Sequence, residues 1–181
     1  MYFKKIAGRR VYLSPMCTGD LEQYTKWLND SAVSDGLGNS AKVISIEREK
    51  EALDEMVKSG FNFAIVRTED DKLIGNLGLF DINHIHRNAQ CGIFIGDEEN
   101  RNKGYGQEAL TLLLEYGFST LNLNNVLLKV FSFNESAIAC YRKVGFTEVG
   151  RRRNSHFLHG RYYDDVHMDI LPDEFFAAKS K

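Results

Sequence analysis

Apolar and polar residues follow two spacings along this chain, alternation and a three-to-four-residue repeat, and each predicts one type of secondary structure. In the first third of the chain they predict, in order, a strand at 9–15, a helix at 18–28, a loop at 30–43 and a helix at 45–59. Thr18 stands where a side-chain oxygen can cap the first helix. The loop is rich in Gly, Ser and Asn. The apolar face of the second helix is expected to comprise Leu53, Met56 and Val57.

The rest of the pattern is richer in strands. A hairpin at 61–82 is predicted around the acidic turn of Glu69, Asp70 and Asp71. After it come a strand at 89–96 and a helix from Gly104 to about Thr120. The buried stripe of that helix should comprise Ala109, Leu112, Leu113 and Tyr116. A central strand at 125–133, covered on both faces, is followed by a short helix at 134–144 and by closing strands at 146–152, 155–160 and 161–171. Asn134 should cap the short helix and Gly145 should end it. The elements predict a single α+β domain over residues 1–181, with a mostly antiparallel sheet and helices on both faces.

Composition is that of a soluble globular protein, with 43% hydrophobic and 27% charged residues among 181. No apolar run approaches the roughly 18 residues of a membrane span, and the N-terminus lacks the apolar segment of a signal peptide. Cys17, Cys91 and Cys140 are widely separated and form no CxxC pair, so neither zinc nor a disulfide framework is predicted. A reducing cytoplasm is the expected location. The net charge of −2 excludes a strongly basic nucleic-acid binder.

Residues 101–106, Arg-Asn-Lys-Gly-Tyr-Gly, combine two cations with two glycines where the long helix should begin. The first backbone N–H groups of a helix lack internal partners and carry partial positive charge, so this position suits a phosphate. Gly104 and Gly106 would let a pyrophosphate approach the backbone, and Arg101 and Lys103 would add charge. A flexible surface turn is the alternative. No P-loop pattern is present, and a dinucleotide fold would place its glycines directly after the strand, whereas eight residues intervene here.

A third pattern, Arg/Gln-x-x-Gly-x-Gly/Ala, fits this loop, and residues 101–106 resemble the pyrophosphate-binding motif of the GNAT acetyltransferases. Residues 134–146 resemble the downstream motif of the same family, an Asn, a helix carrying a Tyr, then Gly-Phe. The motifs occur in the right order, with one strand between them, and the resemblance covers about residues 8–171. More narrowly, residues 81–90 and 157–171 are similar to the branch that holds bacterial spermidine/spermine N-acetyltransferases and the acetyltransferases of ribosomal-protein N-termini.

The resemblance implies a GNAT-like fold and direct transfer of an acetyl group from acetyl-CoA, as co-substrate, to an amine. It implies that backbone N–H groups before the loop stabilise the developing oxyanion and that Tyr141 protonates the leaving thiolate. By the same resemblance the acetyl-CoA site comprises Ile93, Phe94, Ile95, Arg101, Asn102, Lys103, Gly104, Tyr105, Gly106, Asn134, Ala137 and Tyr141. From the helical pattern alone, Tyr141 would instead be a core tyrosine with a bonded hydroxyl, and Asn134 a simple cap.

Asp81 is the catalytic residue expected to orient the amine, because the polyamine enzymes of the family carry an acid at this position; the group that deprotonates the amine is left open. A solvent-facing strand end is the alternative. His84 and His86 follow closely, but no third ligand is evident, so no metal is predicted. Cys140 is expected to be a packed small residue, and the run Arg151, Arg152 and Arg153 to lie along an exposed strand.

The acceptor is less well specified than the reaction. Residues 35–43 carry one aspartate and one lysine, whereas the polyamine enzymes are rich in acid there, and Gly78 and Gln90 occupy two further acidic positions of that branch. A small-molecule amine is the expected partner, with spermidine or a diamine first, and protein N-termini, amino sugars and small amino acids behind. No nucleic-acid or membrane partner is expected, and a homo-oligomer is left open. A catalytically silent acyl-CoA-binding domain is the alternative from another class.

Overall fold

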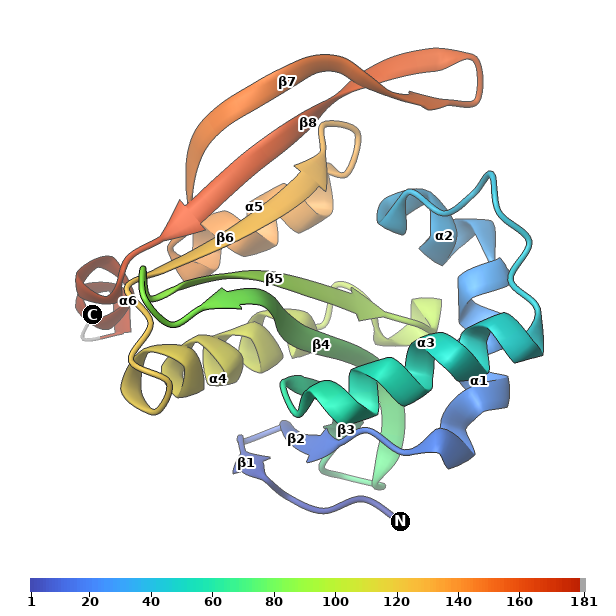
Figure 1. Ribbon diagram of the computed structural model, residues 1–181, viewed down its shortest axis with the longest axis horizontal. Coiled ribbons are helices and arrows are strands. Elements are labelled where there is room, and N and C mark those ends of the chain that lie inside the picture. Colours follow the sequence, from blue (N-terminus) through green and yellow to red (C-terminus); the bar gives the residue numbers. More distant parts are fainter. Residues whose placement is uncertain (180–181) are drawn as a thin grey trace. The chain divides into compact units, whose positions relative to one another are not determined.

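The computed structural model describes residues 1–179, and within that range the chain is α+β with eight strands and six α-helices (Figure 1). Neighbouring strands are hydrogen-bonded in the order β1-β2-β3-β4-β5-β6-β8-β7. The sheet is mostly antiparallel, with β5 and β6 parallel. The chain divides into two compact units, residues 1–78 with 93–112 and residues 79–92 with the chain from 113 onward. The predicted α+β class and mostly antiparallel pairing are confirmed.

The first unit packs helices against an antiparallel ladder. Its elements up to residue 78 are β1 (Ile6–Ala7), β2 (Val11–Pro15), a 3-10 turn (Thr18–Asp20), α1 (Leu21–Asn29), α2 (Ser31–Leu37), α3 (Ile46–Ser59), β3 (Asn62–Arg67) and the first part of β4 (Lys72–Asn83). Residues 93–112 add the end of β5 (Asn88–Ile95), a 3-10 turn (Glu98–Asn100) and the start of α4 (Tyr105–Ser119). Leu13 pairs with Ile65, which pairs in turn with Gly75. The side chains that fill this core come from the ladder and from α1, α2 and α3, and include Tyr12, Tyr24, Trp27, Val33, Leu53, Ala64 and Val66.

The predicted loop at 30–43 is wrong over its first half, which forms α2. The carboxylate of Asp30 accepts a hydrogen bond from the Ala32 N–H at 2.9 Å and so caps the helix, and Gly38 at φ 72° ends it. Val33 is 4% exposed, so the burial of this apolar side chain stabilises the helix. The residues around it are small and polar, and they favour a loop when the sequence is considered alone.

Two details of the flanking helices also differ from prediction. Thr18 does not cap α1 but opens the 3-10 turn before it, where the Cys17 sulfur accepts from the Gly19 N–H at 3.4 Å. On α3, Leu53 is fully buried while Val57 is 41% exposed, so the apolar face of that helix is narrower than predicted. The apolar pattern of a helix does not show where the preceding turn ends or how much of the helix its neighbours cover.

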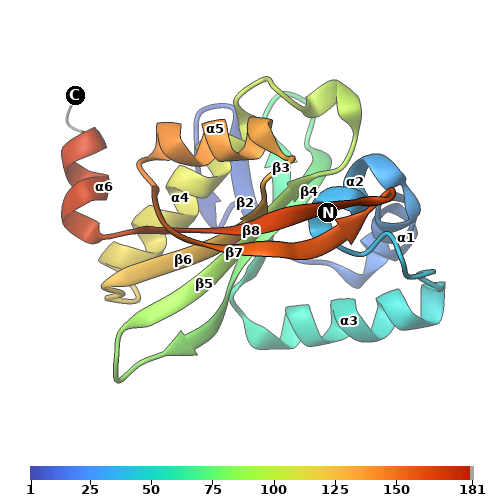
Figure 2. The ribbon, with the colours of Figure 1, turned by 90° about the horizontal axis from the view of Figure 1, so that it is seen from above.

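The second unit is built on a long hairpin. Its elements are the end of β4, the start of β5 (Asn88–Ile95), the end of α4 (Tyr105–Ser119), β6 (Asn125–Phe131), α5 (Glu135–Val144), β7 (Thr147–Leu158), β8 (Arg161–Ile170) and α6 (Pro172–Lys179). In both views α5 lies along one face of β6 and β8 (Figure 2). Val130 and Val166, which pair across these strands, are buried, as is Ile138 of α5.

Three sequence predictions need correction in this unit. Along the strand β6, buried residues alternate with the half-buried Asn125 and Leu127 and the exposed Lys129, so the strand is not covered on both faces. The closing strands expected at 146–152 and 155–160 form one strand, β7, whose pairing with β8 shifts register between Arg152 and His156. Helix α6 was not predicted; Phe175 is 2% exposed there, with its ring 5.5 Å from that of Phe118.

Candidate active site

The glycine loop of the first unit reaches α4 through two residues with left-handed backbone. A 3-10 turn (Glu98–Asn100) leads to Asn102 at φ 58° and Gly104 at φ 82°, and α4 begins at Tyr105. A side chain at Gly104 would be strained at this φ, so glycine is required there. Left-handed residues directly before a helix turn successive N–H groups toward one concavity, which is a geometry that binds anions. The predicted phosphate-binding function of this loop is compatible with its backbone.

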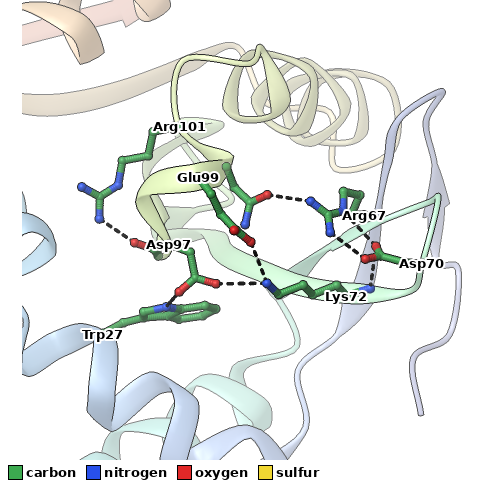
Figure 3. A network of polar contacts seen from close by, with 9 residues as sticks. Trp27, Arg67, Asp70, Lys72, Asp97, Glu99 and Arg101 are labelled. Atoms are coloured by element: carbon green, nitrogen blue, oxygen red, sulfur yellow. Dashed lines mark hydrogen bonds and ion pairs between the residues drawn. The ribbon is translucent and has the colours of Figure 1, made fainter.

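Acidic residues at the start of this loop are neutralised by Lys72 of β4 (Figure 3). The Lys72 ammonium lies 2.8 Å from a carboxylate oxygen of Glu99 and 3.5 Å from one of Asp97. The hydrogen bond from Lys72 lowers the pKa of Glu99. The other oxygen of Asp97 accepts from the Trp27 indole N–H at 2.8 Å, which ties the loop to α1. The acids therefore hold the loop in place with much of their charge compensated.

Arg101 is held against the end of β5. Its Nε donates to the carbonyl of Ile95 at 3.2 Å. Its Nη2 donates to the carbonyl of Gly96 (Figure 3). A Cβ at Gly96 would fall inside the Trp27 ring, so the strand end also needs glycine. The guanidinium that the sequence suggested as a phosphate partner thus joins the loop to the strand, while Lys103 is exposed.

The strand before the loop directs its side chains alternately. The Phe94 ring lies 6.0 Å from the Trp27 ring and 6.4 Å from the Tyr24 ring, in the core formed with α1. On the other face, a Cβ at Gly106 would lie 3.7 Å from Ile95 and 3.8 Å from Ile93. The three half-buried residues, Ile93, Phe94 and Ile95, are therefore fixed by packing, which is what preorganised backbone donors require.

In the second unit, Asn134 and Gly145 bound α5 as predicted. The Asn134 Oδ1 accepts from the Ala137 N–H at 3.2 Å, and Gly145 has φ 114°. Tyr141 lies on this helix, half-buried, with its ring 6.0 Å from that of Phe146. Burial raises the pKa of the Tyr141 phenol above its ordinary 10.0, and nearby Cys91 adds to the shift. Among residues 1–179 no hydrogen bond to the Tyr141 hydroxyl is found, so this proton is not committed to a core partner.

Asp81 is exposed and has φ 51°, a left-handed backbone within strand β4. Its Oδ2 accepts from the Gln90 amide at 2.9 Å, which leaves Oδ1 for another donor. His84 and His86 lie exposed in the turn between β4 and β5. In the described part of the chain no three His, Cys, Asp or Glu residues group as a metal site.

Two further sequence candidates are Cys140 and the arginine run of residues 151–153. Cys140 is half-buried, and burial raises the pKa of its thiol, as in a packed cysteine. The arginine run lies along the exposed strand β7, where Arg151 contacts Glu148 at 2.5 Å. The predicted packing of Cys140 and the predicted exposed strand for the arginine run are therefore confirmed.

Comparison with known proteins identifies the family. The model of the acetyltransferase (GNAT) domain matches residues 10–147, and the chain belongs to this family. It is 37% identical over 108 residues to the spermidine N(1)-acetyltransferase of Escherichia coli K12, an alignment that covers 60% of this chain and 58% of that protein. It is 30% identical over 110 residues to the putative ribosomal N-acetyltransferase YdaF of Bacillus subtilis, covering 61% and 60% of the two chains.

A solved structure extends the likeness to most of the chain. The spermidine N-acetyltransferase of Vibrio cholerae, in complex with CoA and spermine, superposes with a TM-score of 0.83 at 27% identity and covers 92% of this chain and 98% of that one. The predicted GNAT-like fold is thereby confirmed. Within residues 1–179, none of the helices is long and apolar enough to cross a bilayer.

Sequence reasoning missed the residues that hold the glycine loop. Trp27 and Lys72 are 70 and 25 residues from Asp97 in the chain, and neither belongs to a motif. No local signal marks them, because their role depends on the register of β4 and on the packing of α1.

Proposed function

We propose that this protein transfers the acetyl group of acetyl-CoA directly to a primary amine. The observation that carries the proposal is the joint presence, in a GNAT family member, of a glycine loop at the start of α4 and a tyrosine on α5 whose hydroxyl forms no hydrogen bond among the described residues. The Vibrio cholerae structure binds CoA with the same fold, which supports the loop as the phosphate site.

The chemistry assigns one role to each group. The amine lone pair attacks the thioester carbon, and backbone N–H groups of Ile93, Phe94 and Ile95 stabilise the oxyanion that forms. When the C–S bond breaks, the thiolate takes the proton of the Tyr141 hydroxyl. Asp81 accepts a hydrogen bond from the incoming ammonium through its free Oδ1, and the ammonium loses one proton to solvent before its nitrogen attacks. The second proton that the nitrogen releases after attack restores the Tyr141 hydroxyl. No acyl-enzyme is formed.

A polyamine or diamine is the acceptor we propose first, because relatives with 37% and 27% identity are named for spermidine. Two positions reduce the negative charge available to a polycation. Gly78 carries no acid, and a side chain there would collide with the Asn62 amide. Gln90 is uncharged, and its amide donates a hydrogen bond to one carboxylate oxygen of Asp81. Likeness to the ribosomal N-acetyltransferase supports a protein N-terminus as the second candidate.

The test is thiol release from acetyl-CoA in the presence of spermidine, putrescine, a monoamine or a short peptide with a free N-terminus. We expect release to be stimulated most by spermidine or putrescine. Stimulation by the peptide alone would favour N-terminal acetylation. CoA binding without stimulation by any of the four would indicate a catalytically silent domain.

A further inference from the structure

The charge beside the glycine loop comes from a residue that no motif marks. An ideal Cβ on Gly104 would lie 3.3 Å from the Nη1 of Arg10, so this guanidinium lies directly against the loop backbone. The Arg10 Cζ is 4.4 Å from the centre of the Tyr105 ring, the first residue of α4. A cation stacked on this ring therefore faces the segment where the helix N–H groups begin.

The backbone of Arg10 is fixed from two sides. Its N–H donates to the Glu108 carboxylate at 2.8 Å, and its carbonyl accepts from the Thr68 N–H at 2.9 Å. Helix α4 and the end of β3 thus hold residue 10 in register with the loop. A long side chain anchored in this way loses less freedom when it binds a ligand than a free one would.

The Arg10 guanidinium is also free to accept an anion. By contrast, Arg101 of the glycine motif is committed to two carbonyls, and Lys72 is paired with Glu99 and Asp97. Among residues 1–179, Arg10 forms no ion pair with a carboxylate. Its stacking on Tyr105 leaves the N–H edge for two parallel hydrogen bonds to phosphate oxygens.

We infer that Arg10 is a phosphate-binding residue of the CoA site, while Arg101 positions the loop. The inference rests on the proposed use of acetyl-CoA and adds to it a ligand-contacting side chain from outside the glycine motif. The group recognised is a phosphate of CoA, either in the pyrophosphate or at the 3′ position of the ribose.

Calorimetric titration of the full chain with CoA tests this without an acceptor amine. Arg10→Met should weaken CoA binding about tenfold, and Arg10→Lys, which keeps the charge, should lie between that variant and the wild type. Arg9→Met is the matched control: Arg9 is the adjacent exposed arginine, and its N–H also bonds Glu108, at 2.6 Å. It should change the dissociation constant less than twofold.

Salt dependence separates a phosphate contact from a structural role. Because a charged contact is screened, the dissociation constant should rise less steeply with NaCl in Arg10→Met than in the wild type. Repeating the titration with dephospho-CoA locates the contact: a penalty that disappears assigns Arg10 to the 3′-phosphate, and one that persists assigns it to the pyrophosphate.

Three results would overturn the inference. These are unchanged CoA affinity in Arg10→Met, an equal loss in Arg9→Met, or weakened binding with an unaltered salt slope and a lowered melting temperature. A wild-type chain that binds no CoA would instead overturn the proposed function, and this inference with it.

Discussion

At the scale of single residues, Tyr141 shows how a packed position can keep a reactive group. Its ring is half-buried near Phe146, and its hydroxyl forms no hydrogen bond within the described part of the chain. With its pKa raised, the phenol keeps its proton throughout the neutral range, so the proton is present when the thiolate forms.

Tyr141→Phe removes this hydroxyl with almost no change in volume. We expect turnover to fall by about 10² or more, the usual scale for general acid catalysis, with little change in acetyl-CoA affinity or melting temperature. Tyr162→Phe, at a 64% exposed position, is the control and should be silent. Near-normal turnover in Tyr141→Phe would leave water as the proton source.

The pH profile of the wild type follows from the same residue. Because the pKa of Tyr141 is raised above 10.0, the acid stays protonated through the range in which the amine loses its proton. The kcat/KM for the amine should therefore rise with pH and show no descending limb below about pH 10. A descending limb near pH 8 in stopped thiol-release assays would assign the acid to another group.

At the scale of elements, the start of α4 combines a backbone requirement with a packing requirement. Gly104 needs its left-handed φ of 82°, whereas Gly106 is an ordinary helical position with room for a Cβ in van der Waals contact with Ile93 and Ile95. Only Gly106 can therefore be substituted without backbone strain. A substitution there tests ligand binding without a matching loss of stability.

Gly106→Val should raise the Michaelis constant for acetyl-CoA at least tenfold, equivalent to roughly 1.4 kcal/mol of binding, because a branched side chain would keep the pyrophosphate from the helix N–H groups. Gly106→Ala is the graded control and should have a smaller effect. The melting temperature should hold in both variants. An unchanged Michaelis constant in folded Gly106→Val would falsify the phosphate role of this turn.

At the scale of the whole molecule, the free energy of unfolding carries a cost from one buried acid. Glu49 of α3 is 3% exposed, and its Oε1 is without a partner in the described residues. Burial raises its pKa from 4.5 to about 7. The folded chain therefore holds this proton more tightly than the unfolded chain, so the cost is absent below about pH 4.5, grows as the pH approaches 7, and is complete above it.

Glu49→Gln should accordingly raise the melting temperature at pH 8 by a few degrees, since about 1 kcal/mol shifts a chain of this size by roughly 2–4 °C. The gain should shrink as the pH is lowered to 5. Glu51→Gln, at an exposed position on the same helix, should leave the melting curve unchanged at both pH values. Equal melting of Glu49→Gln and the wild type at pH 8 would show that the ionised carboxylate is solvated.

The sequence by itself determined the features whose causes are local. The hairpin turn at Asp70, the Asn134 cap, the Gly145 end of α5 and the glycine loop each depend on a few neighbouring residues, so they could be predicted. The motifs in two of these segments also identified the family correctly.

Tertiary structure decided what distant residues do to one another. Helix α2 is stabilised because Val33 is buried in the core of its unit. Arg101 donates to two backbone carbonyls because β5 ends beside it. Arg10 lies at the glycine loop only because Glu108 and Thr68, 98 and 58 residues away, fix its backbone. Such contacts leave no periodicity in the chain, since they follow from strand register and helix packing rather than from sequence neighbours.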